Sequence, residues 1–233
     1  MDDVWNLRDM HLFSDMTPDQ IDEVLSIMPV RSYRKGEYLF HAGDPADCLY
    51  VLQVGLVKVT YITPNGDEKI LSVFQPGDVF GELFLGRYRH RIGQAQALED
   101  VVACKLRETD FLALIQGFPR IGLNFIRHLA DEQRETMARL HALMRMEARH
   151  RFLGMLLSLA RRLCCPEDGW IEVHPSLTQE DLANMTGLNR STVSSLINEL
   201  RRQGVLGGTG RTLTMNKASI EQMMESAGLE VLE

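Results

Sequence analysis

The chain has 233 residues, of which 45% are hydrophobic, and a formal net charge of −7. Its length suits two domains, its apolar runs are far shorter than the roughly 20 residues of a membrane span, and no charged and apolar leader opens it, so we expect a cytoplasmic protein. The acidic balance argues against a protein that coats nucleic acid indiscriminately, but it permits a local DNA-reading surface.

The four cysteines do not form a metal-binding pattern. Cys48, Cys104, Cys164 and Cys165 lack CxxC spacing, and the adjacent pair cannot easily ligate one metal ion. We expect buried or inert thiols, with an oxidation sensor as the alternative. The histidines are scattered and no His-x-His motif occurs, which argues against a cupin-like metal enzyme, so we expect no catalytic and no metal site.

The first 28 residues are expected to be helical in two pieces. Thr17-Pro18-Asp19-Gln20 has the pattern of a capping box, with Thr17 as the N-cap and Gln20 reaching back. It predicts a helix over residues 20–28 that serves packing.

Short β-type runs separated by glycines then extend from Val30 to about Arg107. Pro64-Asn65-Gly66-Asp67 is a good hairpin turn, and the pattern predicts a small antiparallel barrel or roll. The expected strands are residues 31–33, 38–41, 49–53, 56–63, 69–74, 94–97 and 101–106.

A phosphate-binding pattern lies within this region. Gly81 and Glu82 are followed nine residues after Glu82 by Arg91. Glycine beside a helical turn exposes backbone N–H groups, arginine binds phosphate with two parallel hydrogen bonds, and a carboxylate accepts from a sugar hydroxyl. These residues predict a phosphate-and-ribose pocket. The charged run over residues 87–91 is either an enlarged anion-binding loop or a solvated loop.

A short helix is expected over residues 109–116, followed by one long helix over residues 120–146, which is rich in Leu, Met, Ala, Glu and Arg. Its apolar residues recur at intervals of seven, as expected for a parallel two-helix seam: they are Gly122, Leu129, Thr136 and Leu143 at one position, Phe125 and Met146 at another, and Ile126 and Leu140 beside them. We expect a homodimer. The alternative is a long helix that lies on its own domain.

A helix-turn-helix follows, after a hinge near residues 146–150 and an amphipathic helix over residues 151–164. Thr178 caps a helix over residues 179–185, Gly187 supplies the turn, and a second helix spans residues 189–200. A two-stranded wing over residues 204–214 and a final helix over residues 216–227 complete the chain. The residues expected to contact DNA are Thr178, Gln179, Asn189, Arg190, Ser191, Thr192, Ser194, Ser195 and Arg211.

The chain resembles the catabolite activator and fumarate–nitrate regulator (CRP/FNR) superfamily over essentially its whole length. The resemblance implies an α+β fold with an N-terminal cyclic-nucleotide-binding β-roll (residues 1–119), a dimerisation helix (120–146) and a C-terminal winged helix-turn-helix (147–233). It also implies that cyclic AMP or cyclic GMP is the effector. The implied effector-binding residues are Gly81, Glu82, Leu83, Arg91, Ile92 and Thr136.

The chain departs from the family pattern at several positions. Ile92 replaces the hydroxyl residue that follows the phosphate-binding arginine, and Met137 replaces the second hydroxyl residue of the adenine-contacting pair. The loss of each hydroxyl donor would cost about 1 kcal/mol of binding free energy, which would weaken the binding of the ligand or change which ligand is bound. On the recognition helix Arg190 and Thr192 match, whereas Ser191 and Ser195 replace Glu and Arg, so a G-containing half-site is expected.

The resulting prediction is a homodimeric transcription regulator that binds a palindromic DNA site, contacts RNA polymerase and responds to a small effector such as a cyclic nucleotide. The alternatives are an effector-independent regulator and a sensor of haem or redox state. An oxygen-sensing cluster in this family uses cysteines near the amino terminus, and the first cysteine here is Cys48. A cupin-like enzyme is the distant alternative.

Overall fold

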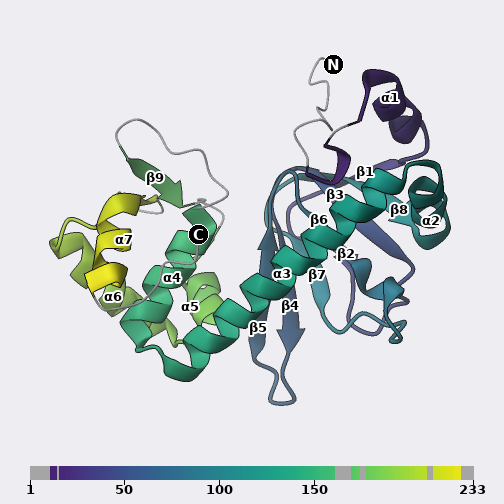
Figure 1. Ribbon diagram of the computed structural model, residues 1–233. Coiled ribbons are helices and arrows are strands. Elements are labelled where there is room, and N and C mark those ends of the chain that lie inside the picture. Colours follow the sequence, from purple (N-terminus) through teal and green to yellow (C-terminus); the bar gives the residue numbers. More distant parts are fainter. Residues whose placement is uncertain (1–10, 15, 161–168, 174–176, 209–211, 227–233) are drawn as a thin grey trace. The chain divides into compact units, whose positions relative to one another are not determined.

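The computed structural model describes residues 11–14, 16–160, 169–173, 177–208 and 212–226, apart from the side chains of residues 11, 25, 83, 144 and 145. The chain divides into two compact units, Met1–Gln133 and Arg134–Glu233. The long helix α3 (Pro119–Arg145) is one continuous helix that contributes residues to both units (Figure 1).

The first unit begins with a 3-10 turn, η2 (His11–Phe13), and helix α1 (Pro18–Ser26). The predicted capping box is present: the Thr17 N–H donates to Gln20 Oε1 at 2.9 Å, and the Gln20 N–H donates to Thr17 Oγ1 at 3.4 Å. Ile21 and Val24 of α1 and Met28 just after it are buried in the core, which confirms that this helix serves packing.

The roll consists of two four-stranded antiparallel sheets, ordered β1-β8-β3-β6 and β2-β7-β4-β5. Their strands are β1 (Val30–Tyr33), β2 (Tyr38–Phe40), β3 (Cys48–Val54), β4 (Val57–Ile62), β5 (Glu68–Phe74), β6 (Val79–Phe80), β7 (Gln94–Ala97) and β8 (Val101–Arg107). The predicted strands are confirmed with ends that differ by at most one residue. Strand β6 was not predicted, because two residues are too few to show a period.

Two apolar clusters hold the roll together. Between the sheets an aromatic series runs from Phe40 through Tyr50 and Phe80 to Phe74, with successive ring centroids 5.9, 5.3 and 4.7 Å apart. The second cluster joins the β1-β8-β3-β6 sheet to α1, α2 (Glu108–Gly117) and the start of α3. Its aromatic centre is Phe111, which packs edge-on between Phe84 and Phe125.

Helix α3 presents only part of the face that the sequence predicted for a dimer seam: Ile126, Leu140 and Leu143 are exposed, whereas the other predicted residues of its first turns are not. Phe125 is buried in the core, Leu129 packs against the same core, and a Cβ on Gly122 would lie 3.0 Å from Ile115. The first turns of α3 therefore cover their own unit, as the alternative required. The exposed row shares Ile126 and Leu140 with the predicted seam and has spacings of three and four residues: Leu123, Ile126, Ala130, Gln133, Met137 and Leu140.

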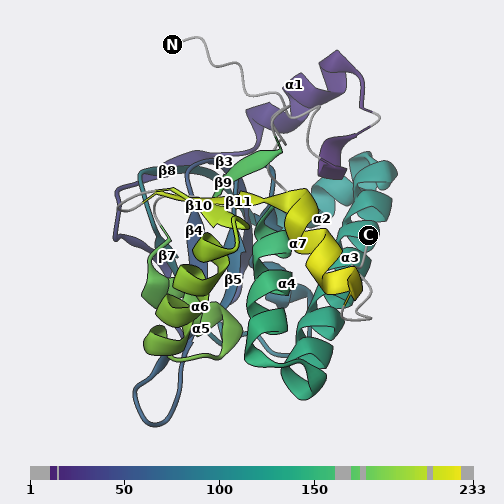
Figure 2. The ribbon, with the colours of Figure 1, turned by 90° about the vertical axis from the view of Figure 1, so that its left-hand side faces the viewer.

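The second unit contains, besides the end of α3, the helices and strands of a winged helix-turn-helix. They are α4 (Ala148–Ala160), β9 (Trp170–Val173), α5 (Gln179–Thr186), α6 (Arg190–Arg202), β10 (Leu206–Gly207), β11 (Leu213–Asn216) and α7 (Lys217–Ser226). Figure 2 shows the small sheet beside α5 and α6. The predicted pairing of two wing strands is confirmed by β10 and β11, and β9, which was not predicted, pairs with β11 as a third strand. The predicted end of the helix over residues 151–164 lies outside the described residues.

Candidate effector site and nucleic-acid interface

Arg91 is buried in the roll, with 3% of its surface exposed. Its guanidinium donates from Nη1 to the carbonyl oxygen of Gly81 and from Nη2 to that of Cys48, each at 2.6 Å, and lies 4.4 Å from the centroid of the Phe40 ring. Gly81 has a φ of +89°, and a Cβ there would lie 2.9 Å from Arg91 Nη1. The glycine is therefore needed both for its backbone conformation and for space.

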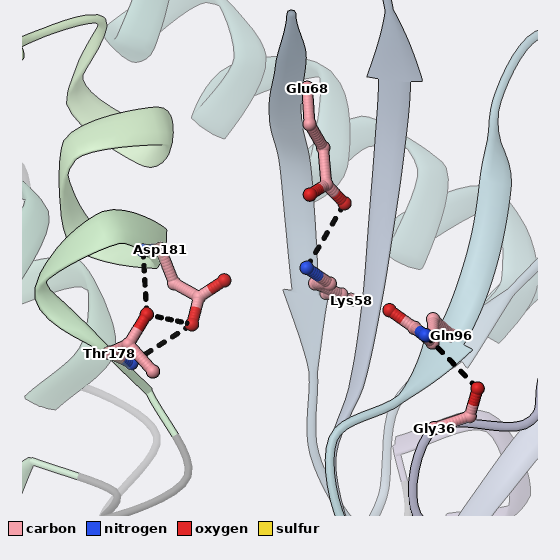
Figure 3. Close-up of polar contacts among 6 residues, drawn as sticks. All are labelled: Gly36, Lys58, Glu68, Gln96, Thr178 and Asp181. Atoms are coloured by element: carbon pink, nitrogen blue, oxygen red, sulfur yellow. Dashed lines mark hydrogen bonds and ion pairs between the residues drawn. The ribbon is translucent and has the colours of Figure 1, made fainter.

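The charge of Arg91 is not neutralised by an acid. Among the residues that the structure describes, no carboxylate forms an ion pair with Arg91, and its buried Nε has no hydrogen-bond partner. Lys58, also buried, shows the usual arrangement, because its Nζ lies 3.0 Å from Glu68 Oε1 on the neighbouring strand (Figure 3). Burying an unpaired cation is unfavourable, so the roll holds a positive charge suited to an anion.

Glu82 begins the 3-10 turn η3 (Glu82–Leu85) and does not bond to Arg91 within the described structure. Burial is the main cause that raises the pKa of its carboxyl. His128 and Arg91 are near enough to lower that pKa, whereas Glu132 raises it further. The Nε2 atom of His128 is buried without a hydrogen-bond partner. The effector turn and α3 thus bring titratable groups together.

The other predicted effector residues contribute less to this arrangement. Ile92 is 60% exposed, and Thr136 is exposed on the part of α3 that belongs to the second unit. The side chain of Leu83 lies outside the described part of the chain. In the charged loop, Tyr88 is 85% exposed and Arg89 Nη1 lies 2.7 Å from Glu108 Oε2. These features favour a solvated loop over an enlarged anion-binding loop.

The described cysteines, Cys48 and Cys104, are free and buried. Burial raises the pKa of the Cys104 thiol to about 12 and also raises that of Cys48, so both stay in the unreactive thiol form. Cys164 and Cys165 lie outside the described residues. Within the described residues, no three His, Cys, Asp or Glu side chains gather as a metal site.

The helix-turn-helix begins with a capping box at α5. The Asp181 N–H donates to Thr178 Oγ1 at 3.1 Å, and Asp181 Oδ2 accepts from the Thr178 N–H at 2.9 Å and from its hydroxyl at 2.6 Å (Figure 3). The Thr178 hydroxyl is therefore engaged in capping, whereas neighbouring Gln179 is exposed. Gly187 ends the helix with φ +67°, as its predicted place in the turn requires.

Helix α6 presents a polar face at its start. Asn189 Oδ1 accepts from the Thr192 N–H at 2.8 Å and from the Ser191 hydroxyl at 2.7 Å, so these groups cap the helix. Arg190 is exposed and makes no hydrogen bond or ion pair within the described residues. Ser195 is exposed one turn later, and Ser194 is half-buried. Asn198 is exposed on the same face, as its spacing from Ser194 and Ser195 predicts.

Of the remaining predicted contacts, Arg211 lies outside the described residues. The predicted reading face therefore consists, within the described chain, of Arg190 and the small polar residues around it. An exposed guanidinium is suited to the edge of guanine, and hydroxyl and amide groups are suited to bases or phosphates.

Two family models match the chain, the Cyclic nucleotide-binding domain over residues 30–118 and the Crp-like helix-turn-helix domain over residues 150–221. The "Cyclic AMP receptor protein" of Thermus thermophilus is 32% identical over 213 residues, which cover 91% of this chain and 95% of that protein. The chain belongs to the CRP/FNR family of transcription regulators. The "CRP-like cAMP-activated global transcriptional regulator" of Mycobacterium tuberculosis is 28% identical and covers 88% of this chain, with 92% of its own length matched.

Among solved structures, FixK2 from Bradyrhizobium japonicum has a TM-score of 0.74 at 25% identity and covers 84% of this chain, with 96% of its own chain matched. The predicted fold class and the predicted DNA-binding regulator are thereby confirmed. The family consists of transcription regulators rather than enzymes, so the cupin-like alternative is wrong. Over the described residues, no helix of this regulator is both long and apolar enough to cross a bilayer.

Proposed function

We propose that this regulator is a homodimer that binds an anionic effector in its roll and reads a palindromic DNA site with one α6 helix from each subunit. We assign residues 1–119 to effector binding, 120–146 to dimerisation and 147–233 to DNA binding. RNA polymerase is the proposed downstream partner. A protein that must meet chromosomal DNA is expected in the cytoplasm.

The buried guanidinium of Arg91 carries the effector proposal. It is 3% exposed, its described hydrogen bonds are to the carbonyl oxygens of Gly81 and Cys48 and to the Cys48 sulfur, and its Nε has no partner. A cyclic phosphate would supply the missing negative charge. Glu82, nine residues earlier, would accept from a sugar hydroxyl. Cyclic AMP and cyclic GMP are the candidates, since relatives of this chain are named for cyclic AMP.

The exposed row on α3 supports the dimer. Leu123, Ile126, Met137 and Leu140 are 49 to 64% exposed, and together with exposed Ala130 and Gln133 they recur at spacings of three and four residues. This is the spacing of a two-helix seam, and Gln133 lies in the middle, where a polar residue can fix the register. Two recognition helices about 34 Å apart then fit successive turns of the major groove.

Calorimetric titration of the full chain with cyclic AMP and cyclic GMP tests the effector proposal. We expect binding of at least one nucleotide by the wild type, a loss of roughly 10- to 100-fold in affinity for Arg91→Ala, and a smaller loss for Arg91→Lys, which keeps the charge without the two-pronged donor. Arg89→Ala, which removes an exposed arginine of the same loop, is the matched control and is expected to bind as the wild type does.

Two other outcomes would redirect the proposal. No heat with either nucleotide, together with tight DNA binding by the free protein, would identify an effector-independent regulator. A Soret absorption band in the purified protein would identify a haem sensor. Thermal midpoints of all variants separate loss of binding from loss of folding.

A further inference from the structure

Arg149 lies where a basic residue is unfavourable for its own helix. It is the second residue of α4, and the first turn of α4 contains no acidic residue. The N-terminal end of a helix carries a partial positive charge, so a cation there destabilises the helix. Because Arg149 interacts unfavourably with the dipole of its own helix, we expect another contact to offset this cost.

The compensating partners lie at the other end of the recognition helix. Arg149 Nη1 donates to Glu199 Oε1, and Nη2 donates to Gln203 Oε1 at 2.7 Å. Glu199 and Gln203 are one turn apart at the C-terminal end of α6, where the last carbonyl groups carry a partial negative charge. The guanidinium therefore complements both a carboxylate and the dipole of α6. Its Nη2 also lies 3.9 Å from Met223 Sδ on α7.

This contact joins two helices that otherwise pack mainly on other elements. Helix α6 packs against α5 and β10, whereas α4 packs against α5, α7 and β9. Arg149 provides a polar link from α4 to α6. Arg149 lies two residues after Glu147, which belongs to the short connection between α3 and α4.

We propose that Arg149 is a positioning residue for DNA reading: through Glu199 and Gln203 it fixes the tilt of α6 relative to the helix that follows the hinge. The proposal rests on α6 being the DNA-reading helix. Glu199 and Arg190 are nine residues apart, or about 14 Å along the axis. A tilt of about 10° at the Glu199 end would move Arg190 by about 2 Å, enough to break hydrogen bonds to a base edge.

The test uses the full chain and a DNA duplex selected from a random library by the wild-type protein. Glu199→Arg adds positive charge, so general electrostatic attraction would tighten its binding to any DNA. The positioning role predicts the opposite for the selected duplex, because Arg149 then faces another cation. We expect affinity for the selected duplex to fall about tenfold while affinity for random duplex is unchanged or higher.

The charge exchange Arg149→Glu with Glu199→Arg keeps the net charge and restores an ion pair of reversed polarity. We expect it to recover the affinity for the selected duplex to within about threefold of the wild type. The matched control is Lys217→Glu. Lys217 also lies at the start of a helix and pairs with Glu221, with side-chain exposures of 34% and 36% against 31% and 38% for Arg149 and Glu199, but its pair lies within one helix. It is expected to leave the ratio of specific to random binding unchanged.

Several results would overturn the proposal. Failure of the exchanged pair to recover, or an equal change on selected and random duplex in Glu199→Arg, would reduce the ion pair to a stabilising contact. In Arg149→Met, a decrease of about one in the slope of log affinity against log salt would mean that Arg149 itself binds a phosphate. Arg190→Ala tests the proposed function separately from the role of Arg149. Unchanged affinity for the selected duplex in that variant would show that α6 does not read DNA, and the positioning proposal would then fail as well.

Discussion

The carboxyl of Glu82 makes the stability of the roll depend on pH. In the unfolded chain a glutamate titrates near its ordinary pKa of about 4.3, whereas burial raises the pKa of Glu82 in the folded chain. The folded state therefore binds more protons between these two values. Its contribution to stability is present below the ordinary pKa and is lost as the pH rises through the raised one.

Glu82→Gln removes this titration. We expect the variant to unfold at a higher temperature than the wild type at neutral pH, with a difference that disappears toward pH 4 because the wild-type carboxyl is then protonated. Thermal unfolding followed across that range measures it. Glu23→Gln, at an exposed position on α1, is the control. A difference that is the same at pH 4 and pH 7 would contradict the role assigned to burial.

The buried thiols give a second prediction at the residue scale. In a Cys164→Ser, Cys165→Ser variant the remaining thiols are those of Cys48 and Cys104, both buried with raised pKa values. We expect no reaction with a thiol reagent in the native state and complete reaction after denaturation. Reaction of either thiol within minutes in the folded protein would favour the oxidation-sensor alternative.

At the scale of elements, the capping box of α5 stabilises the helix-turn-helix. Asp181 is buried and its Oδ2 accepts two hydrogen bonds from Thr178. We expect Asp181→Ala to lower the free energy of unfolding of the second unit by about 1 kcal/mol, within the usual range for caps. Glu180→Ala, one residue earlier and exposed, is expected to cost clearly less. Denaturant titration followed by circular dichroism compares the two.

The elements were predictable from the sequence where local chemistry decides them. The capping residues Thr17 and Thr178 and the turn glycine Gly187 act through their near neighbours, so their patterns can be read directly. Strands β6 and β9 were missed because two or four residues carry little periodicity. The face of α3 was predicted only in part, because the burial of Phe125 and Gly122 depends on Phe111 and Ile115 of another helix.

The candidate sites were predictable only in part. Residue types and spacing indicate Arg91 and Arg190. That Arg91 binds backbone carbonyls of Gly81 and Cys48 cannot be read from a sequence, because every residue carries a carbonyl group. The pair Arg149 and Glu199 is separated by 50 residues, and no local pattern connects them.

For the whole molecule, the exposed row on α3 predicts the oligomeric state. An unpaired carboxylate in an apolar seam costs several kcal/mol, so we expect Ile126→Glu and Leu140→Glu each to weaken the dimer at least 100-fold. Sedimentation velocity at micromolar concentration measures this. Leu112→Glu, at a position on α2 that is 42% exposed, is the control and is expected to sediment as the wild type. A wild-type monomer would contradict the proposed dimer.

The reading face of α6 is sparsely charged, since Arg190 is the one charged residue among residues 189–198. Electrostatic attraction to the DNA phosphates supplies most of the affinity of a regulator for non-specific DNA. With a net charge of −7 and one cation on its reading face, the chain is therefore expected to bind random DNA weakly. In a genome with roughly a million or more competing sites, this leaves a larger share of the molecules free to search for their own promoters.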